Sequence, residues 1–133
     1  MNAKQELRNF IDGEFTSAAS GAGMDVINPS TGEVYATAPQ SGPEDVDAAC
    51  RAAQRAFENG WRDTTPGERM ACMLRLADAI ESDAERLVAV EAENTGKPRA
   101  LTMSEEIPPM VDQVRFFAGA ARMLEGRSTG EYM

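Results

Sequence analysis

The sequence contains no histidine and only two cysteines among its 133 residues. Without histidine, the chain lacks the commonest general base, the Ser-His and Cys-His nucleophile pairs, and the usual zinc ligands. Cys50 and Cys72 are too few for a disulfide framework. Both lie in helical patterns, which favours buried structural thiols over nucleophiles. Any catalysis by this chain alone would therefore depend on carboxylates, lysine or tyrosine.

Basic residues are also scarce. The chain has thirteen basic and twenty-two acidic residues, which give a net charge of −9. Such a surface repels phosphate backbones and anionic lipids, so nucleic acid and membranes are poor partners. No apolar run reaches the roughly 18–20 residues that span a bilayer. The start, MNAKQELRNF, lacks the apolar stretch of a signal peptide. We therefore expect a cytoplasmic protein.

Residues 1–40 have the pattern of two β-hairpins. In the first, residues 8–11 and 14–17 flank Asp12-Gly13, a pair that tolerates the positive φ angles of a type I′ turn. In the second, DVIN and EVYATAP flank the turn PSTG, with Pro29 early in the turn and Gly32 late. The rest of the chain has a different, helical periodicity.

The periodicity of residues 41–126 predicts a layer of about four helices. Capping-box pairs mark three starts: Ser41 with Glu44, Thr65 with Glu68, and Ser82 with Glu85. A fourth helix is predicted from about Ile107 to Leu124, ending at Gly126. The expected apolar faces are Val46, Ala49, Cys50, Ala53 and Phe57; Met70, Met73, Leu74, Ala77 and Ile80; Leu87, Val88 and Val90; and Met110, Val114, Phe117, Ala121 and Leu124.

The predicted architecture lacks a sheet large enough to cover these helical faces. We therefore expect residues 1–133 to form a single but unfinished unit, with residues 127–133 as the start of a further strand.

The stretch ENTGKP (residues 93–98) contains a Gly-Lys pair, but it does not match a phosphate-binding P-loop. A P-loop has a glycine five residues before its Gly-Lys pair and a helix after the pair. Here Glu91 stands at the position of that first glycine, and Pro98 directly follows the lysine. The segment ends a helix, and helix C-termini repel phosphate. Gly96 is instead predicted as a left-handed helix cap, with Pro98 blocking continuation.

Two acidic residues, Glu105 and Glu106, stand side by side before the fourth predicted helix. They either complement the positive end of that helix or take part in binding a cation, and both interpretations stay open. No G-x-G-x-x-G dinucleotide fingerprint occurs in the chain.

An ordered set of motifs resembles the N-terminal part of NAD(P)-dependent aldehyde dehydrogenases. The motifs are FIDGEF, VINPSTGEVYATAP, DVDAACRAAQRAF, TPGERMACMLRLADAIE, ENTGKP and RFFAGAA, in that order. The match covers the chain from Asn9 to Met133, and the run SEEIPPMVDQVRFFAGAARMLEGRSTGEYM looks most like the aminobutyraldehyde and betaine-aldehyde branch.

The resemblance implies an α/β parent enzyme, of which this chain is an incomplete part of the cofactor-binding domain. The parent would oxidise an aldehyde such as 4-aminobutanal to its acid with NAD or NADP, as a homodimer or homotetramer. The family's catalytic cysteine, general-base glutamate, oxyanion asparagine and cofactor motif have no counterpart here. The isolated chain is therefore expected to be inactive and to bind no cofactor. A stand-alone interaction module derived from this family is the alternative.

The resemblance also implies two sites. One is a monovalent-cation site at backbone carbonyls near Ile27 and Asn94, where many relatives carry Asp at the position of Asn94. The other is the mouth of the substrate tunnel, where Glu106, with Glu105 beside it, would attract the ammonium group of the substrate. Pro109 departs from the usual pattern of the aminoaldehyde branch in this region.

Overall fold

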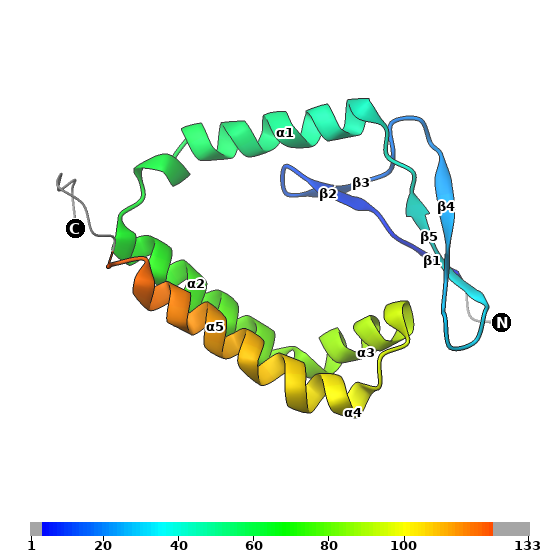
Figure 1. Cartoon of the computed structure of the whole chain (residues 1–133). Helices are drawn as coiled ribbons and strands as arrows, with labels where there is room; N and C mark the ends of the chain where they lie inside the picture. The colour runs from blue at the N-terminus through cyan, green and yellow to red at the C-terminus, as the bar shows by residue number, and fades with distance from the viewer. Residues whose placement is uncertain (1–3, 124–133) are drawn as a thin grey trace. The chain divides into compact units, whose positions relative to one another are not determined.

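The computed structural model describes residues 4–123, which divide between Arg62 and Asp63 into two compact units. The first unit begins with five strands: β1 (Gln5–Glu6), β2 (Asn9–Ile11), β3 (Glu14–Thr16), β4 (Gly23–Ile27) and β5 (Val34–Pro39). The helix α1 (Pro43–Glu58) completes it (Figure 1). The short 3₁₀ helix η1 (Trp61–Asp63) contains the boundary between the units.

Both predicted hairpins are present. Strands β2 and β3 pair antiparallel, and Asp12 and Gly13 between them have φ angles of 57° and 83°. These values are those of a type I′ turn. Strands β4 and β5 form the second hairpin, whose turn includes Gly32 with φ of 73°. Strand β1, which the sequence pattern did not predict, pairs in parallel with β5 and gives a three-stranded sheet in the order β1-β5-β4.

Helix α1 begins one residue later than predicted. Gly42 is its N-cap and Pro43 its first residue, so the third helical position falls on Asp45 rather than Glu44. The Asp45 carboxylate accepts a hydrogen bond of 2.8 Å from the Gly42 N–H. The predicted cap, Ser41, accepts instead from the side-chain amide of Asn9 in β2.

The predicted apolar face of α1 is largely exposed. Val46 and Phe57 are 58% and 50% exposed, whereas Asp45 and Ala52 are buried. The hairpin β2–β3 lies alongside this helix (Figure 1), and a groove between them is lined on the helix by Ala49, Ala52, Ala53 and Ala56. Alanines lie on the predicted face of α1 and also on the face beside it. The sequence pattern therefore did not distinguish these two faces.

The second unit consists of α2 (Pro66–Ser82), α3 (Ala84–Thr95), the short α4 (Arg99–Leu101), the π-helical segment η2 (Thr102–Glu106) and α5 (Ile107–Ala120). Helices α2 and α5 lie side by side along their length (Figure 1). The core of this unit is formed by Ala77, Ala84, Val88, Ile107 and Val111, with Ile80, Met103 and Val114 packed against it. Burying each of the larger of these side chains stabilises the fold by about 1.5–3 kcal/mol.

The capping box of α2 is confirmed, because the Glu68 N–H donates to Thr65 Oγ1 and the Thr65 N–H donates to Glu68 Oε2. The box predicted at Ser82 and Glu85 is wrong. Helix α2 continues through Ser82, whose hydroxyl donates to the carbonyl of Ala79, and Asp83 is the N-cap of α3.

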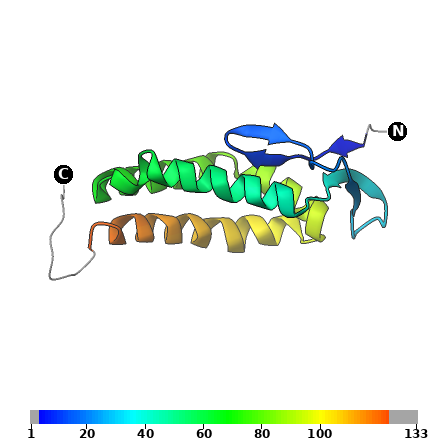
Figure 2. The ribbon, with the colours of Figure 1, turned by 90° about the horizontal axis from the view of Figure 1, so that it is seen from above.

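The fourth predicted helix begins at Ile107, as predicted, where it continues an upstream helical stretch, and it ends earlier than predicted. Its backbone is already helical from Arg99, and α4, η2 and α5 form one continuous rod, yellow to orange in Figure 2. It ends at Ala120, four residues before the prediction, where Arg122 and Met123 bond back three residues to Gly119 and Ala120. Such bonds tighten and close a last turn. The predictions for Leu124, Gly126 and residues 127–133 lie outside the described residues.

The buried stripe of α5 is Ile107, Val111 and Ala118, with Val114 half-buried. Of the predicted stripe, Met110 and Phe117 are 41% and 58% exposed. The reason is that α5 packs on α2 with the side that carries Ile107 and Val111, so Met110 and Phe117 remain exposed, whereas Val114 of the predicted stripe packs against the core.

Candidate functional site

The turn after α3 carries the Gly-Lys pair. Gly96 has φ of 77°, and its N–H donates to the carbonyl of Ala92 at 2.9 Å. The prediction of a left-handed cap is thus confirmed, and the pair is not a phosphate loop. Lys97 follows on this turn, where its N–H donates to the hydroxyl oxygen of Thr95.

Lys97 is paired with two carboxylates. Its ammonium lies 3.0 Å from Glu106 Oε2 and 3.3 Å from Glu91 Oε1. All three side chains are about two-fifths exposed, at 43%, 42% and 41%. The hydrogen bonds with Glu106 and then Glu91 raise the pKa of Lys97 above its ordinary value, so the ammonium stays charged at neutral pH.

The π-helical segment η2 determines where Glu106 lies. A π-helix has an extra residue in its turn, and such turns are frequent at functional sites. In η2 the buried Thr102 donates its hydroxyl to the carbonyl of Pro98 at 3.2 Å, which anchors the segment to the Lys97 turn. Glu106 is its last residue, and its carboxylate lies back over that turn. The neighbouring Glu105 is exposed.

The two residues predicted for a monovalent cation fall in different units. Ile27 ends strand β4 of the first unit, next to a β-bulge, and Asn94 lies in the last turn of α3 in the second. The cation site therefore stays a prediction. Among residues 4–123, no group of three or more Cys, Asp or Glu side chains is arranged to hold a metal ion.

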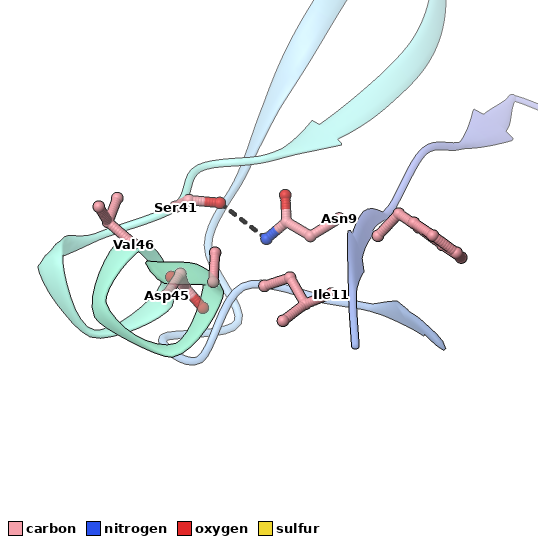
Figure 3. A pocket seen from close by; sticks show the side chains of 7 residues that line it. Asn9, Ile11, Ser41, Asp45 and Val46 are labelled. Atoms are coloured by element: carbon pink, nitrogen blue, oxygen red, sulfur yellow. Dashed lines mark hydrogen bonds between the residues drawn. The ribbon is translucent and has the colours of Figure 1, made fainter. Parts of the chain in front are cut away.

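The first unit contains an open groove of about 250 Å³ between the hairpin β2–β3 and the start of α1. Figure 3 shows Asn9 and Ser41 pointing toward one another, with Ile11 and Val46 on the walls; the Asn9–Ser41 hydrogen bond is 2.8 Å long. The Asp45 carboxylate beside it already accepts from the backbone N–H groups of Gly42 and Ala19. Those bonds hold the pKa of Asp45 below its ordinary value. This groove contains no pair of a nucleophile and a base.

The two thiols lie in different units. Cys50 on α1 is exposed, and Cys72 on α2 is half-buried. Both were expected to be buried, and Cys50 is exposed. Since the chain has no G-x-G-x-x-G motif and its Gly-Lys pair ends a helix, no described residue is assigned to a dinucleotide. No helix within residues 4–123 is long and apolar enough to cross a membrane.

Comparison with known proteins identifies the class. The sequence model of the aldehyde dehydrogenase family matches residues 15–132. An aldehyde dehydrogenase of Alternaria alternata is 38% identical over 118 residues, which are 89% of this chain and 24% of that protein. The 2-aminomuconic semialdehyde dehydrogenase of Homo sapiens is 39% identical over 120 residues, 90% of this chain and 24% of that protein.

Solved structures agree with the sequence relatives. The structure of an NAD⁺ complex of aldehyde dehydrogenase from Bacillus cereus matches with a TM-score of 0.87 and 37% identity, over 94% of this chain and 26% of that one. The chain therefore belongs to the aldehyde dehydrogenase family and has part of that fold. It spans about a quarter of the length of the curated relatives that it matches.

The pairing of Lys97 with Glu91 and Glu106 was not predicted from the sequence. Lys97 was considered only as a phosphate ligand, and its separation of nine residues from Glu106 is not a helical spacing. The one available signal was the excess of acid around a single lysine between residues 91 and 106.

Proposed function

We propose that this chain is the N-terminal segment of a cytoplasmic enzyme that oxidises an aldehyde to its carboxylic acid with NAD or NADP. The observation that carries the proposal is the family match over residues 15–132, and the NAD⁺ complex of the Bacillus cereus relative supports the cofactor. The nicotinamide, when bound, would accept the hydride. The partners of this segment are the remainder of the dehydrogenase and the other subunits of a homodimer or homotetramer.

The segment would contribute to substrate recognition rather than to bond making. Within residues 4–123, the candidate is the half-exposed carboxylate of Glu106 at the end of η2. We propose an aminoaldehyde such as 4-aminobutanal as the substrate class, as in the aminobutyraldehyde and betaine-aldehyde branch. Its ammonium group would lie near Glu106, with Glu105 adding to the local negative potential.

The size of the effect follows from elementary electrostatics. A carboxylate and a cation 4 Å apart attract each other by about 4 kcal/mol at an effective dielectric constant near 20. Because Glu106 is 42% exposed and already paired with Lys97, solvent and the existing ion pair reduce this gain. About 1.4 kcal/mol would remain, which corresponds to roughly tenfold in binding.

The test is Glu106→Gln in the full-length enzyme. The measured quantity is the ratio of kcat/KM for 4-aminobutanal to kcat/KM for butanal, which differ in charge at one end. We expect this ratio to fall about tenfold. Glu93→Gln is the matched control, because it removes the same charge from an exposed position on α3. Equal ratios for the two variants would reduce Glu106 to a structural residue.

A further inference from the structure

Lys97, Glu91 and Glu106 together carry one net negative charge, because two carboxylates share one ammonium. The ammonium is about equally close to both, at 3.3 Å from Glu91 and 3.0 Å from Glu106. Glu91 belongs to the last two turns of α3 and Glu106 ends η2, so Lys97 joins two elements that meet at the Gly96–Pro98 turn. One further monovalent cation would make the group neutral.

We propose that Lys97 determines how strongly Glu106 selects cationic substrates. In this proposal the Lys97 ammonium contacts both Glu106 and Glu91 when no substrate is present. When the primary ammonium group of an aminoaldehyde reaches Glu106, the Lys97 ammonium contacts Glu91 alone. The inference rests on the proposed function, since it assigns a partner to the carboxylate that recognises the substrate.

The side chain of lysine suits such an exchange. Its ammonium is a compact charge with three rotatable N–H donors on a flexible four-carbon stem, so it changes partners without moving the backbone. The backbone around it is fixed by the left-handed cap at Gly96 and by the hydrogen bond from Thr102 to Pro98. Glu91 prevents the displaced ammonium from losing its ion pair, and that second contact distinguishes the site from a single surface salt bridge.

The exchange predicts a graded selectivity. An uncharged aldehyde has no cation to offer Glu106, and an anionic aldehyde meets the net negative charge of the group. A substrate ammonium gains its contact with Glu106 only after displacing Lys97. Since pairs exposed to this degree contribute little individually, removing Lys97 changes selectivity by a few-fold rather than by orders of magnitude.

Three variants of the full-length enzyme test the proposal through the same ratio of kcat/KM for 4-aminobutanal to kcat/KM for butanal. Lys97→Met removes the competing ammonium, and we expect the ratio to rise about fourfold. Glu91→Gln removes the second partner, which keeps Lys97 on Glu106, and we expect the ratio to fall about twofold. Lys97→Arg keeps the charge, and we expect no rise.

Arg99→Met is the matched control, because Arg99 is exposed and lies two residues after Lys97, so this variant also removes one positive charge from the same region. A rise in the ratio as large for Arg99→Met as for Lys97→Met would overturn the inference, since the effect would then be one of general charge. Circular dichroism and the thermal midpoint establish that each variant is folded before its kinetics are compared.

The outcomes separate this inference from the proposed function. If Glu106→Gln lowers the ratio but Lys97→Met leaves it unchanged, the proposed function stands and the role of Lys97 is wrong. If Glu106→Gln leaves the ratio unchanged, both are wrong. A rise for Lys97→Met that disappears in the double variant Lys97→Met, Glu106→Gln supports both.

Discussion

Asp45 is a buried carboxylate that ties two segments of the first unit together. One oxygen accepts from the Ala19 N–H and the other from the Gly42 N–H, each at 2.8 Å. The first bond holds the segment before β4, and the second closes the start of α1. Both terminal atoms of the side chain must accept a hydrogen bond here. The amide of asparagine has only one acceptor oxygen, because its nitrogen is a donor.

We predict that Asp45→Asn lowers the thermal midpoint at pH 7 by roughly 3–6 °C. The pKa of Asp45 is depressed by the hydrogen bonds from Gly42 and then Ala19. A depressed pKa means that the carboxylate stabilises the fold above the unfolded pKa of about 3.9, and that this contribution disappears as the pH falls through the folded pKa. The difference in thermal midpoint between wild type and Asp45→Asn should therefore have its full size above about pH 5 and become smaller below about pH 4.

Thermal melts followed by circular dichroism between pH 7 and pH 2.5 provide the measurement. Glu44→Gln, one residue away and exposed, is the control and should leave the midpoint nearly unchanged. A difference between Asp45→Asn and wild type that stays constant down to pH 2.5 would contradict the assignment, because it would not depend on ionisation.

Single residues were predictable where the backbone demands a particular type. Gly96 and Gly32 occupy positive φ angles that glycine adopts freely, and the sequence pattern located both. Ser41 was misassigned because several residues near a helix start can act as cap, and a partner 32 positions away, Asn9, binds its hydroxyl. The contact of Lys97 with Glu106 depends on a π-helical turn, for which the sequence has no recognised signal.

At the scale of elements, α2 shows how a capping box differs from a similar sequence that is not one. Thr65 and Glu68 exchange hydrogen bonds at the start of α2, and the Thr65 N–H lowers the pKa of Glu68. Ser82 and Glu85 have the same spacing, but Ser82 lies inside the helix. Side-chain caps act only where backbone N–H groups are left without helical partners.

We predict that Thr65→Ala destabilises the chain by about 1 kcal/mol, because one N–H at the start of α2 loses its acceptor. Ser82→Ala is the matched variant and should stay within about 0.5 kcal/mol of wild type, since alanine is a better helix former. Urea unfolding followed at 222 nm measures both. Equal losses would mean that the hydroxyl of Thr65 contributes nothing beyond the helix propensity of its position.

At the scale of the whole molecule, apolar side chains remain exposed in each unit when that unit is considered by itself. Phe10 and Phe15 on the first hairpin are 65% and 69% exposed, and Phe116 and Phe117 on α5 are 68% and 58% exposed. The rings form contacting pairs, with centroids 5.1 Å and 5.3 Å apart. Contiguous exposed patches of this kind favour association.

We predict that the isolated 133-residue chain self-associates and binds an apolar dye. Light scattering coupled to size-exclusion chromatography should show species larger than the 14.4 kDa monomer. Replacing Phe116 and Phe117 by serine should shift the distribution toward monomer and reduce dye fluorescence. A monodisperse monomer with no dye binding would contradict the prediction.

Family membership was predictable from the order of motifs, and the two hairpins and the helical layer followed from turn residues and periodicity. The buried faces of α1 and α5 did not follow. A helical pattern shows that an apolar face exists, but which of two adjacent faces is buried depends on the neighbouring elements. Strand β1 was missed for a related reason: two residues, Gln5 and Glu6, carry no alternation that marks a strand.

The π-helical turn at Thr102–Glu106 makes this region tolerant of a change in chain length in a way that its sequence does not reveal. The turn contains one more residue than an α-helical turn, so it acts as an insertion of a single amino acid absorbed within a helix. Deleting one residue there would restore α-helical winding and leave the segments on either side in nearly their present orientation, because the wider π-turn already absorbs the extra residue. With α5 held in the core by Ile107 and Val111, the glutamate that precedes α5 and the lysine that it meets would stay on the same side of the rod. An alignment gap of one residue at this point would therefore be compatible with the same packing of α5 in homologues.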